Sequence, residues 1–65
     1  MDTDTIKGQW KQIKGRIRER WGELTDDDVE QIKGHKEHLV GRLQERYGIA
    51  KDDARKQVRE FENSL

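Results

Sequence analysis

Apolar residues recur along this 65-residue chain at intervals of three and four, the spacing that gathers side chains on one face of an α-helix. The first such stripe consists of Ile6, Trp10, Ile13, Ile17 and Trp21. We expect a helix from about Asp4 to Trp21, preceded by capping residues and ended by Gly22 in the left-handed conformation. Both tryptophans lie on the stripe and are therefore interpreted as core residues.

A second helix start is encoded by the segment 24–29. Thr25 is suited to the N-cap position, and Asp26, Asp27 and Asp28 fill the first turn, where the helix dipole favours anions. Leu24 and Val29 occupy the positions of a hydrophobic staple. We expect the three aspartate side chains to be exposed and therefore ionised.

Glycines are expected to delimit the third helix. Gly34 is predicted to end the second helix, so that a third helix runs from about His35 to Tyr47; one continuous helix through Gly34 is the alternative. Its stripe consists of Leu39, Leu43 and Tyr47, with Val40 at the edge. Gly48 is expected to end the helix, and Ile49 to fold back on Leu43.

A fourth helix is expected to begin near Lys51, with a poorer N-cap than that of the second. It presents Ala54, Val58, Phe61 and Leu65 on its apolar face.

The chain contains an internal repeat. The octapeptide 15–22 (GRIRERWG) returns 26 positions later as 41–48 (GRLQERYG), and all six glycines pair at this offset. We infer repeat units of approximately 6–31 and 32–57, each one helical hairpin. Neither unit has enough apolar surface to fold alone, so the pattern predicts one all-α domain over 1–65, made of two packed hairpins.

The composition limits the stability and the cellular location that can be expected of the protein. Only 29% of residues are hydrophobic and 43% are charged, which predicts marginal stability for a chain of this length. Cysteine and proline are absent from the sequence, as is any long apolar run. These features argue against disulfides, a secretory signal and a transmembrane segment, and they favour a cytoplasmic location.

Charge is segregated although the formal net charge is zero. A basic stripe of Lys7, Lys11, Lys14 and Arg18 precedes the acidic start of the second helix. In one interpretation, the basic and the acidic helix form surface ion pairs with each other within the molecule. A second has the stripe bind nucleic acid or another polyanion. A third is weak head-to-tail self-association or membrane-surface contact.

Four glycines, Gly8, Gly15, Gly34 and Gly41, lie almost opposite the apolar stripes on a helical wheel. One interpretation is an inherited feature that keeps the helices weak, because each mid-helix glycine costs about 1 kcal/mol relative to alanine. The other is a surface of close approach to a second subunit, another backbone or a polyanion.

Catalytic and metal chemistry find little support in the sequence. His35 and His38 are one turn apart, but neither Glu37 nor Glu45 completes a recognisable ligand set. No serine has a plausible base beside it, and exposed first-turn aspartates make a poor acid–base pair. We therefore expect no enzyme activity, no cofactor and no metal.

The chain resembles the CsbD-like family of small bacterial stress-response proteins. The resemblance rests on 8–11 (GQWK), Gly15, 21–27 (WGELTDD), Gly34, 39–41 (LVG), Gln44 and 47–48 (YG). It implies two packed helical hairpins in a SAM-domain-like arrangement and abundance under general stress. The family has no established activity or ligand, so no catalytic or binding residue can be transferred. The resemblance thus implies a non-enzymatic stress protein that acts by abundance or through a weak protein partner.

Overall fold

Four α-helices follow one another in the computed structural model, which describes residues 8–65. They are α2 (Trp10–Arg20), α3 (Asp26–Ile32), α4 (Lys36–Tyr47) and α5 (Lys51–Asn63). This part of the chain contains no β-strand, and the predicted all-helical class is confirmed. The expected helix start at Asp4, and Ile6 of the first stripe, lie outside the described residues. The prediction that this helix continues without a break to Trp21 is wrong at Gln9, which has a non-helical backbone (φ −113°, ψ 23°) and caps the start of α2 at Trp10.

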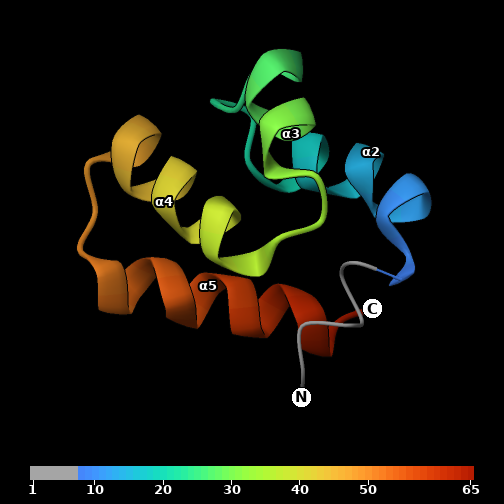
Figure 1. Ribbon diagram of the computed structural model, residues 1–65. Helices are drawn as coiled ribbons and strands as arrows, with labels where there is room; N and C mark the ends of the chain where they lie inside the picture. Colours follow the sequence, from blue (N-terminus) through green and yellow to red (C-terminus); the bar gives the residue numbers. More distant parts are fainter. Residues whose placement is uncertain (1–7) are drawn as a thin grey trace.

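The helices pack in the order of the chain. Helix α4 lies along α5, α3 contacts α4, and α2 contacts α3 (Figure 1). The end of α2 is also attached to α5, because the Trp21 and Phe61 rings pack with centroids 5.1 Å apart. In addition, the Trp21 indole N–H donates a hydrogen bond of 2.9 Å to Gln57 Oε1. The arrangement therefore closes around a shared interior.

That interior is built from the predicted apolar stripes. The buried apolar residues are Ile13, Ile17, Trp21, Leu24, Val29, Ile32, Leu39, Val40, Leu43, Ala54, Val58 and Phe61. Trp10 and Ile49 are half-buried and pack against this core. The specific contact expected between Ile49 and Leu43 stays a prediction. The core position predicted for Tyr47 is wrong, since this residue is 38% exposed. Leu65, at 37%, is also exposed.

Gly34 lies in a turn that separates the second and third predicted helices. Helix α3 ends at Ile32, after which Lys33 (φ 51°) and Gly34 (φ 81°) both adopt left-handed conformations. Gly34 is buried within this turn. The predicted break is thus confirmed, and the alternative of one continuous helix is wrong.

The other two glycine predictions have opposite outcomes. Gly48 adopts a φ of 64° and ends α4, as expected. The left-handed conformation expected for Gly22 is wrong, because the left-handed glycines of the described chain are Gly34 and Gly48. Helix α2 ends one residue before Trp21, whose φ is −127°. The chain reverses there through a turn in which Leu24 N–H donates to Trp21 O, so Gly22 is not needed in a left-handed conformation.

The starts of α3 and α5 differ in their helix caps. Thr25 Oγ1 accepts a hydrogen bond of 3.1 Å from Asp28 N–H, while Asp28 Oδ2 accepts one of 3.0 Å from Thr25 N–H. This reciprocal capping box confirms the predicted start of α3. Helix α5 begins after Ala50, which offers no side-chain cap, and the predicted poorer start is also confirmed.

The helix boundaries follow the spacing of the sequence repeat in part. Helices α2 and α4 begin at Trp10 and Lys36, 26 residues apart, whereas α3 and α5 begin 25 residues apart. Within residues 8–65, no helix combines the length and the apolar character needed to cross a lipid bilayer.

Candidate functional site

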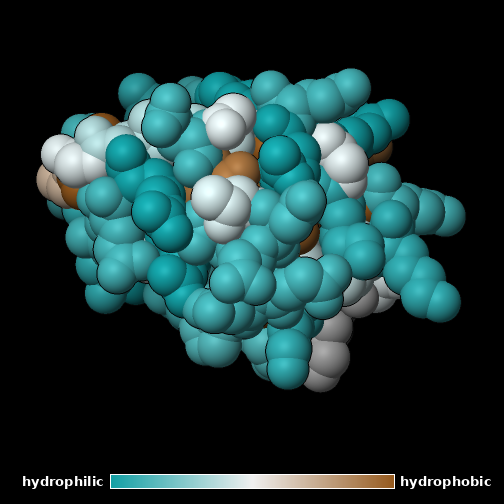
Figure 2. Space-filling model, turned by 90° about the horizontal axis from the view of Figure 1, so that it is seen from above, coloured by the Kyte–Doolittle hydropathy of each residue, from teal (hydrophilic) through white to brown (hydrophobic). Residues whose placement is uncertain are grey.

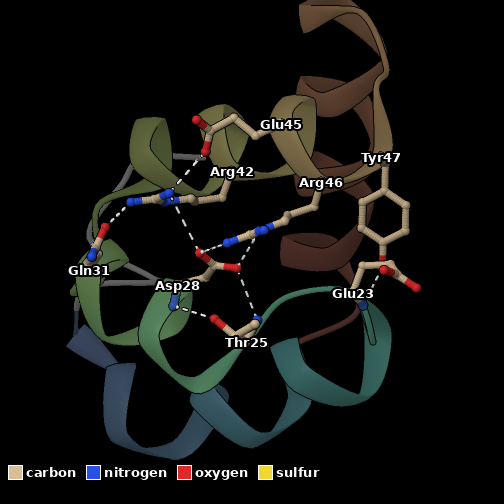
Figure 3. A network of polar contacts seen from close by, with 8 residues as sticks. All are labelled: Glu23, Thr25, Asp28, Gln31, Arg42, Glu45, Arg46 and Tyr47. Atoms are coloured by element: carbon tan, nitrogen blue, oxygen red, sulfur yellow. Dashed lines mark hydrogen bonds and ion pairs between the residues drawn. The ribbon is translucent and has the colours of Figure 1, made fainter.

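Asp28 is the centre of a polar cluster between α3 and α4. It is only 2% exposed, so the expectation that all three first-turn aspartates are exposed is wrong for this one. Arg46 of α4 clamps it with hydrogen bonds from Nε to Oδ2 (2.8 Å) and from Nη2 to Oδ1 (3.0 Å). Arg42 Nη1 lies 3.6 Å from Oδ1 (Figure 3). The third-position aspartate of α3 thus faces two arginines one turn apart on α4.

These contacts hold Asp28 in its charged form. The hydrogen bonds from Arg46, helped by the backbone of Thr25, lower the Asp28 pKa from 3.8 to about 2, against the opposing effect of burial. The same contact raises the pKa of Arg46. A carboxylate that is ionised at every physiological pH, with both oxygens occupied, is unsuited to proton transfer. The cluster is therefore a structural joint between two helices.

Further polar contacts surround this joint. Arg42 donates a hydrogen bond of 3.0 Å to Glu45 Oε1 and a second one to Gln31 Oε1. At the far end of α4, the Tyr47 hydroxyl accepts a hydrogen bond of 3.1 Å from Glu23 N–H (Figure 3). Tyr47 therefore ties the turn before α3 to α4 from the surface, which explains why it is not part of the core.

The basic stripe is divided by the structure. Arg18 forms an ion pair with Asp26, and Lys14 Nζ lies 3.7 Å from Glu30 Oε2. Lys11 is exposed, and Lys7 lies outside the described residues. Two of the four cations thus face the acidic side of α3, as the intramolecular interpretation requires.

A second buried carboxylate, Glu62 near the end of α5, was missed by the sequence analysis. Its side chain is fully buried, and its Oε1 lies 3.2 Å from Nζ of Lys36 at the start of α4. Neither carboxylate oxygen has a hydrogen-bond partner within residues 8–65. This ion pair joins the ends of two helices in the way that the Asp28 cluster joins α3 and α4.

The two histidines lie next to each other, with ring centroids 5.2 Å apart. In the described residues, no group of three or more His, Cys, Asp or Glu side chains is arranged so that it could hold a metal ion. His38 lines an open hollow of about 480 Å³ together with Gln31, Glu37, Gly41, Arg42 and Glu45.

Comparison with known proteins places the chain in a family. The sequence pattern of the CsbD-like family matches residues 4–56. The chain belongs to the CsbD-like family.

Curated relatives match this CsbD-like chain over a shorter segment. A UPF0337 protein of Pseudomonas aeruginosa is 63% identical over 30 residues, which are 46% of each chain. UPF0337 protein YjbJ of Escherichia coli is 55% identical over 29 residues, 45% of this chain and 42% of the relative. A UPF0337 protein of Rhizobium meliloti is 53% identical over 30 residues, 46% of this chain and 44% of the relative. The match spans about half the length of these relatives.

Of the four glycines predicted to lie opposite the apolar stripes, Gly15 and Gly41 lie within helices, whereas Gly8 precedes α2 and Gly34 lies between α3 and α4. Gly8 and Gly15 are exposed and Gly41 is half-buried, and a Cβ built on any of them meets nothing within 4 Å apart from its own helix backbone and chain neighbours. Gly34, by contrast, is the buried residue of the α3–α4 turn. Gly15 lines a hollow of about 220 Å³ with Lys14, Arg18, Asp26, Val29 and Glu30. Packing within the described molecule therefore gives no reason for glycine at positions 8, 15 and 41, and close approach of another molecule stays a prediction.

One face of the CsbD-like domain is strongly hydrophilic. Figure 2 shows one face of the molecule on which polar residues dominate and apolar residues are seen only in small isolated areas. The hollows at Gly15 and Gly41 are bordered mainly by charged and amide side chains. Polar side chains of this kind are well hydrated and offer a partner weak polar contacts.

Proposed function

We propose that this CsbD-like chain is a non-enzymatic, stress-associated protein that acts by its abundance or through a weak protein partner. The proposal is carried by one observation: the principal charged clusters of the described chain are used to join its own helices. Asp28 is held by Arg42 and Arg46, and the acidic side of α3 pairs with Lys14 and Arg18.

Two other functions find less support. Catalysis at the Asp28 cluster would need a carboxyl group that exchanges its proton near neutral pH, whereas the pKa of Asp28 is about 2 and both of its oxygens are occupied. Polyanion binding would need the basic stripe to be available. Lys14 and Arg18 would have to exchange their contacts with Glu30 and Asp26 for phosphates, which lowers the net gain from binding.

The proposal can be tested in a bacterium that lacks its own CsbD-like protein. Survival after osmotic shock and in stationary phase is measured while the chain is produced at graded levels. Exposed charges are neutralised two at a time, and each variant is kept only when its circular dichroism and cellular amount match the wild type. A binding defect obeys mass action, so extra protein should restore rescue to any variant that has lost it.

Two outcomes of this experiment would contradict the proposal. An enzyme inactivated at its active site stays inactive however much of it is made. A folded variant that fails to rescue even at several times the normal amount would therefore contradict the non-enzymatic role. Rescue that is unrelated to the amount of wild-type protein would contradict action by abundance or weak binding.

A further inference from the structure

The repeat provides the chain with two arginine pairs in equivalent places, and the structure uses them differently. Arg42 and Arg46 on α4 hold the buried Asp28. Their counterparts 26 positions earlier, Arg16 and Arg20 on α2, are both exposed. No carboxylate among residues 8–65 forms an ion pair with either of them.

The exposed arginine pair lines one side of an open hollow. The hollow measures about 400 Å³ and is completed by Glu19, Phe61 and Ser64. The Arg20 guanidinium lies 5.2 Å from the centroid of the Trp21 ring, close enough for a cation–π contact. This contact orients Arg20 without satisfying its hydrogen-bond donors, which are directed best at a carboxylate.

The chain also has two aspartates in the third position of a helix, and again only one is used internally. Asp28 is the third residue of α3, and Asp53 is the third residue of α5. Asp53 is exposed and forms no ion pair with a described residue. The helix start that it belongs to has Ala50 at the N-cap and no side-chain cap. Asp53 therefore has the same position within its helix as Asp28 but lacks the arginines, although the 26-residue offset of the sequence repeat pairs Asp53 with Asp27.

Arg16 and Arg20 form no ion pair with Asp53 in the same molecule. Their hollow is bordered by Phe61 and Ser64, at the carboxyl end of α5. Asp53 lies in the first turn of that helix, eight residues before Phe61, and a helix rises about 1.5 Å per residue, so the separation along α5 is about 12 Å. The two ends of α5 are seen in Figure 1.

We propose that Arg16 and Arg20 bind Asp53 of a second copy of this chain, reproducing between molecules the contact that Arg42 and Arg46 make with Asp28. The interface is head-to-tail, because the two partners are different surfaces, and it can extend to short chains of molecules. Contacts between exposed charges are weak and are screened by salt. The association is therefore expected to be weak, with a dissociation constant of about 1 mM or higher. Such self-association goes beyond the proposed function, since that function can equally rest on a different protein partner.

The test is a dilution series followed by NMR of the full chain labelled with ¹⁵N. In the wild type, the Arg16 and Arg20 side-chain N–H signals and the amide signals around Asp53 should shift together with concentration. Both R16Q/R20Q and D53N should lose this dependence. Adding unlabelled D53N to labelled R16Q/R20Q should restore the shifts around Asp53, because each variant retains the half that the other lacks.

Two control variants match the changes in charge. K56Q/R59Q removes two exposed cations from α5, as R16Q/R20Q does from α2, and D27N removes one exposed first-turn aspartate from α3. Both should behave like the wild type. Loss of the dilution shifts in these controls would attribute the association to net charge and overturn the proposal.

Two further results would also overturn it. One is concentration-independent arginine signals that change only in a D2N/D4N variant, because the arginines would then be bound by acids of their own chain. The other is a mixture of R16Q/R20Q and D53N that fails to restore the shifts around Asp53 while both proteins remain folded.

Discussion

Replacing Asp28 by asparagine removes the charge on which Arg46 and Arg42 converge while leaving the size of the side chain almost unchanged. The pKa of Asp28 falls from 3.8 to about 2 in the folded chain, and each pKa unit corresponds to about 1.4 kcal/mol, so the charge contributes at most about 2.5 kcal/mol. The Arg46 side chain is 43% exposed, and solvent reduces this figure. We expect Asp28→Asn to lower the free energy of unfolding by about 1–2 kcal/mol.

The assay is thermal and urea unfolding at pH 7, followed by circular dichroism and by the fluorescence of the buried Trp21. For a domain of this size, 1 kcal/mol shifts Tm by about 4–8 °C, so a fall of about 5–15 °C is expected. Asp27→Asn is the matched control, because it removes a neighbouring but exposed aspartate from the same helix turn. Its cost should be about 0.5 kcal/mol, the value of one charge near the helix dipole.

The stabilisation by Asp28 should decrease as the pH is lowered. Because folding lowers the Asp28 pKa, its contribution is complete above the unfolded value of 3.8 and is lost as pH falls toward about 2. The wild type and Asp28→Asn should therefore differ at pH 7 and converge near pH 2. Equal stabilities at pH 7, or a difference that persists unchanged at pH 2, would refute the reasoning.

Three further predictions concern the two glycines within helices, the Lys36–Glu62 ion pair and the Tyr47 hydrogen bond. Gly15→Ala and Gly41→Ala should each raise the stability by about 1 kcal/mol, since a Cβ meets nothing there; a lowered Tm would contradict this. Lys36→Ala should cost about 1–3 kcal/mol in urea unfolding by leaving the Glu62 carboxylate buried without its cation. Adding Glu62→Gln should recover most of that loss, and an unaffected single variant would refute the role of this pair. Tyr47→Phe should cost about 0.5 kcal/mol and speed hydrogen exchange at the backbone N–H of Glu23.

Local signals in the sequence predicted most of the helical architecture. The three- and four-residue spacing identified Ile13, Ile17, Leu39 and Leu43 as core residues, because the helix period alone decides which side chains share a face. The start of α3 followed from Thr25, since a capping box is made within one turn and needs no distant partner.

Features that depend on distant contacts were not predictable in the same way. The position of Asp28 in the first helical turn is encoded locally, but its burial depends on which helix packs across it. The sequence signal that could have indicated a buried partner is the pair Arg42 and Arg46, which lie one turn apart and present two donors on one face of α4. Tyr47 occupies a core position on the stripe but lies at the helix end, where its hydroxyl reaches the backbone of Glu23.

Glycine conformations were predicted correctly only where a helix ends in a left-handed residue. Gly48 follows that rule, and Gly34 continues a left-handed turn begun by Lys33. Gly22 has the same sequence context as Gly48, but the burial of Trp21 against Phe61 ends α2 one residue earlier. Packing of the preceding aromatic residue, which the sequence repeat does not reveal, decides the difference.

We propose that the basic stripe of Lys7, Lys11, Lys14 and Arg18 does not bind polyanions, because Lys14 and Arg18 are paired with α3. The most direct test is fluorescence anisotropy of labelled duplex and single-stranded DNA titrated with the protein at about 50 and 200 mM salt, the range in which phosphate-binding proteins lose most of their affinity. The comparison is a variant with all four cations of the stripe changed to glutamine. We predict no salt-sensitive binding by either protein. Binding that weakens with salt and disappears in the variant would contradict the account and assign the stripe to nucleic acid.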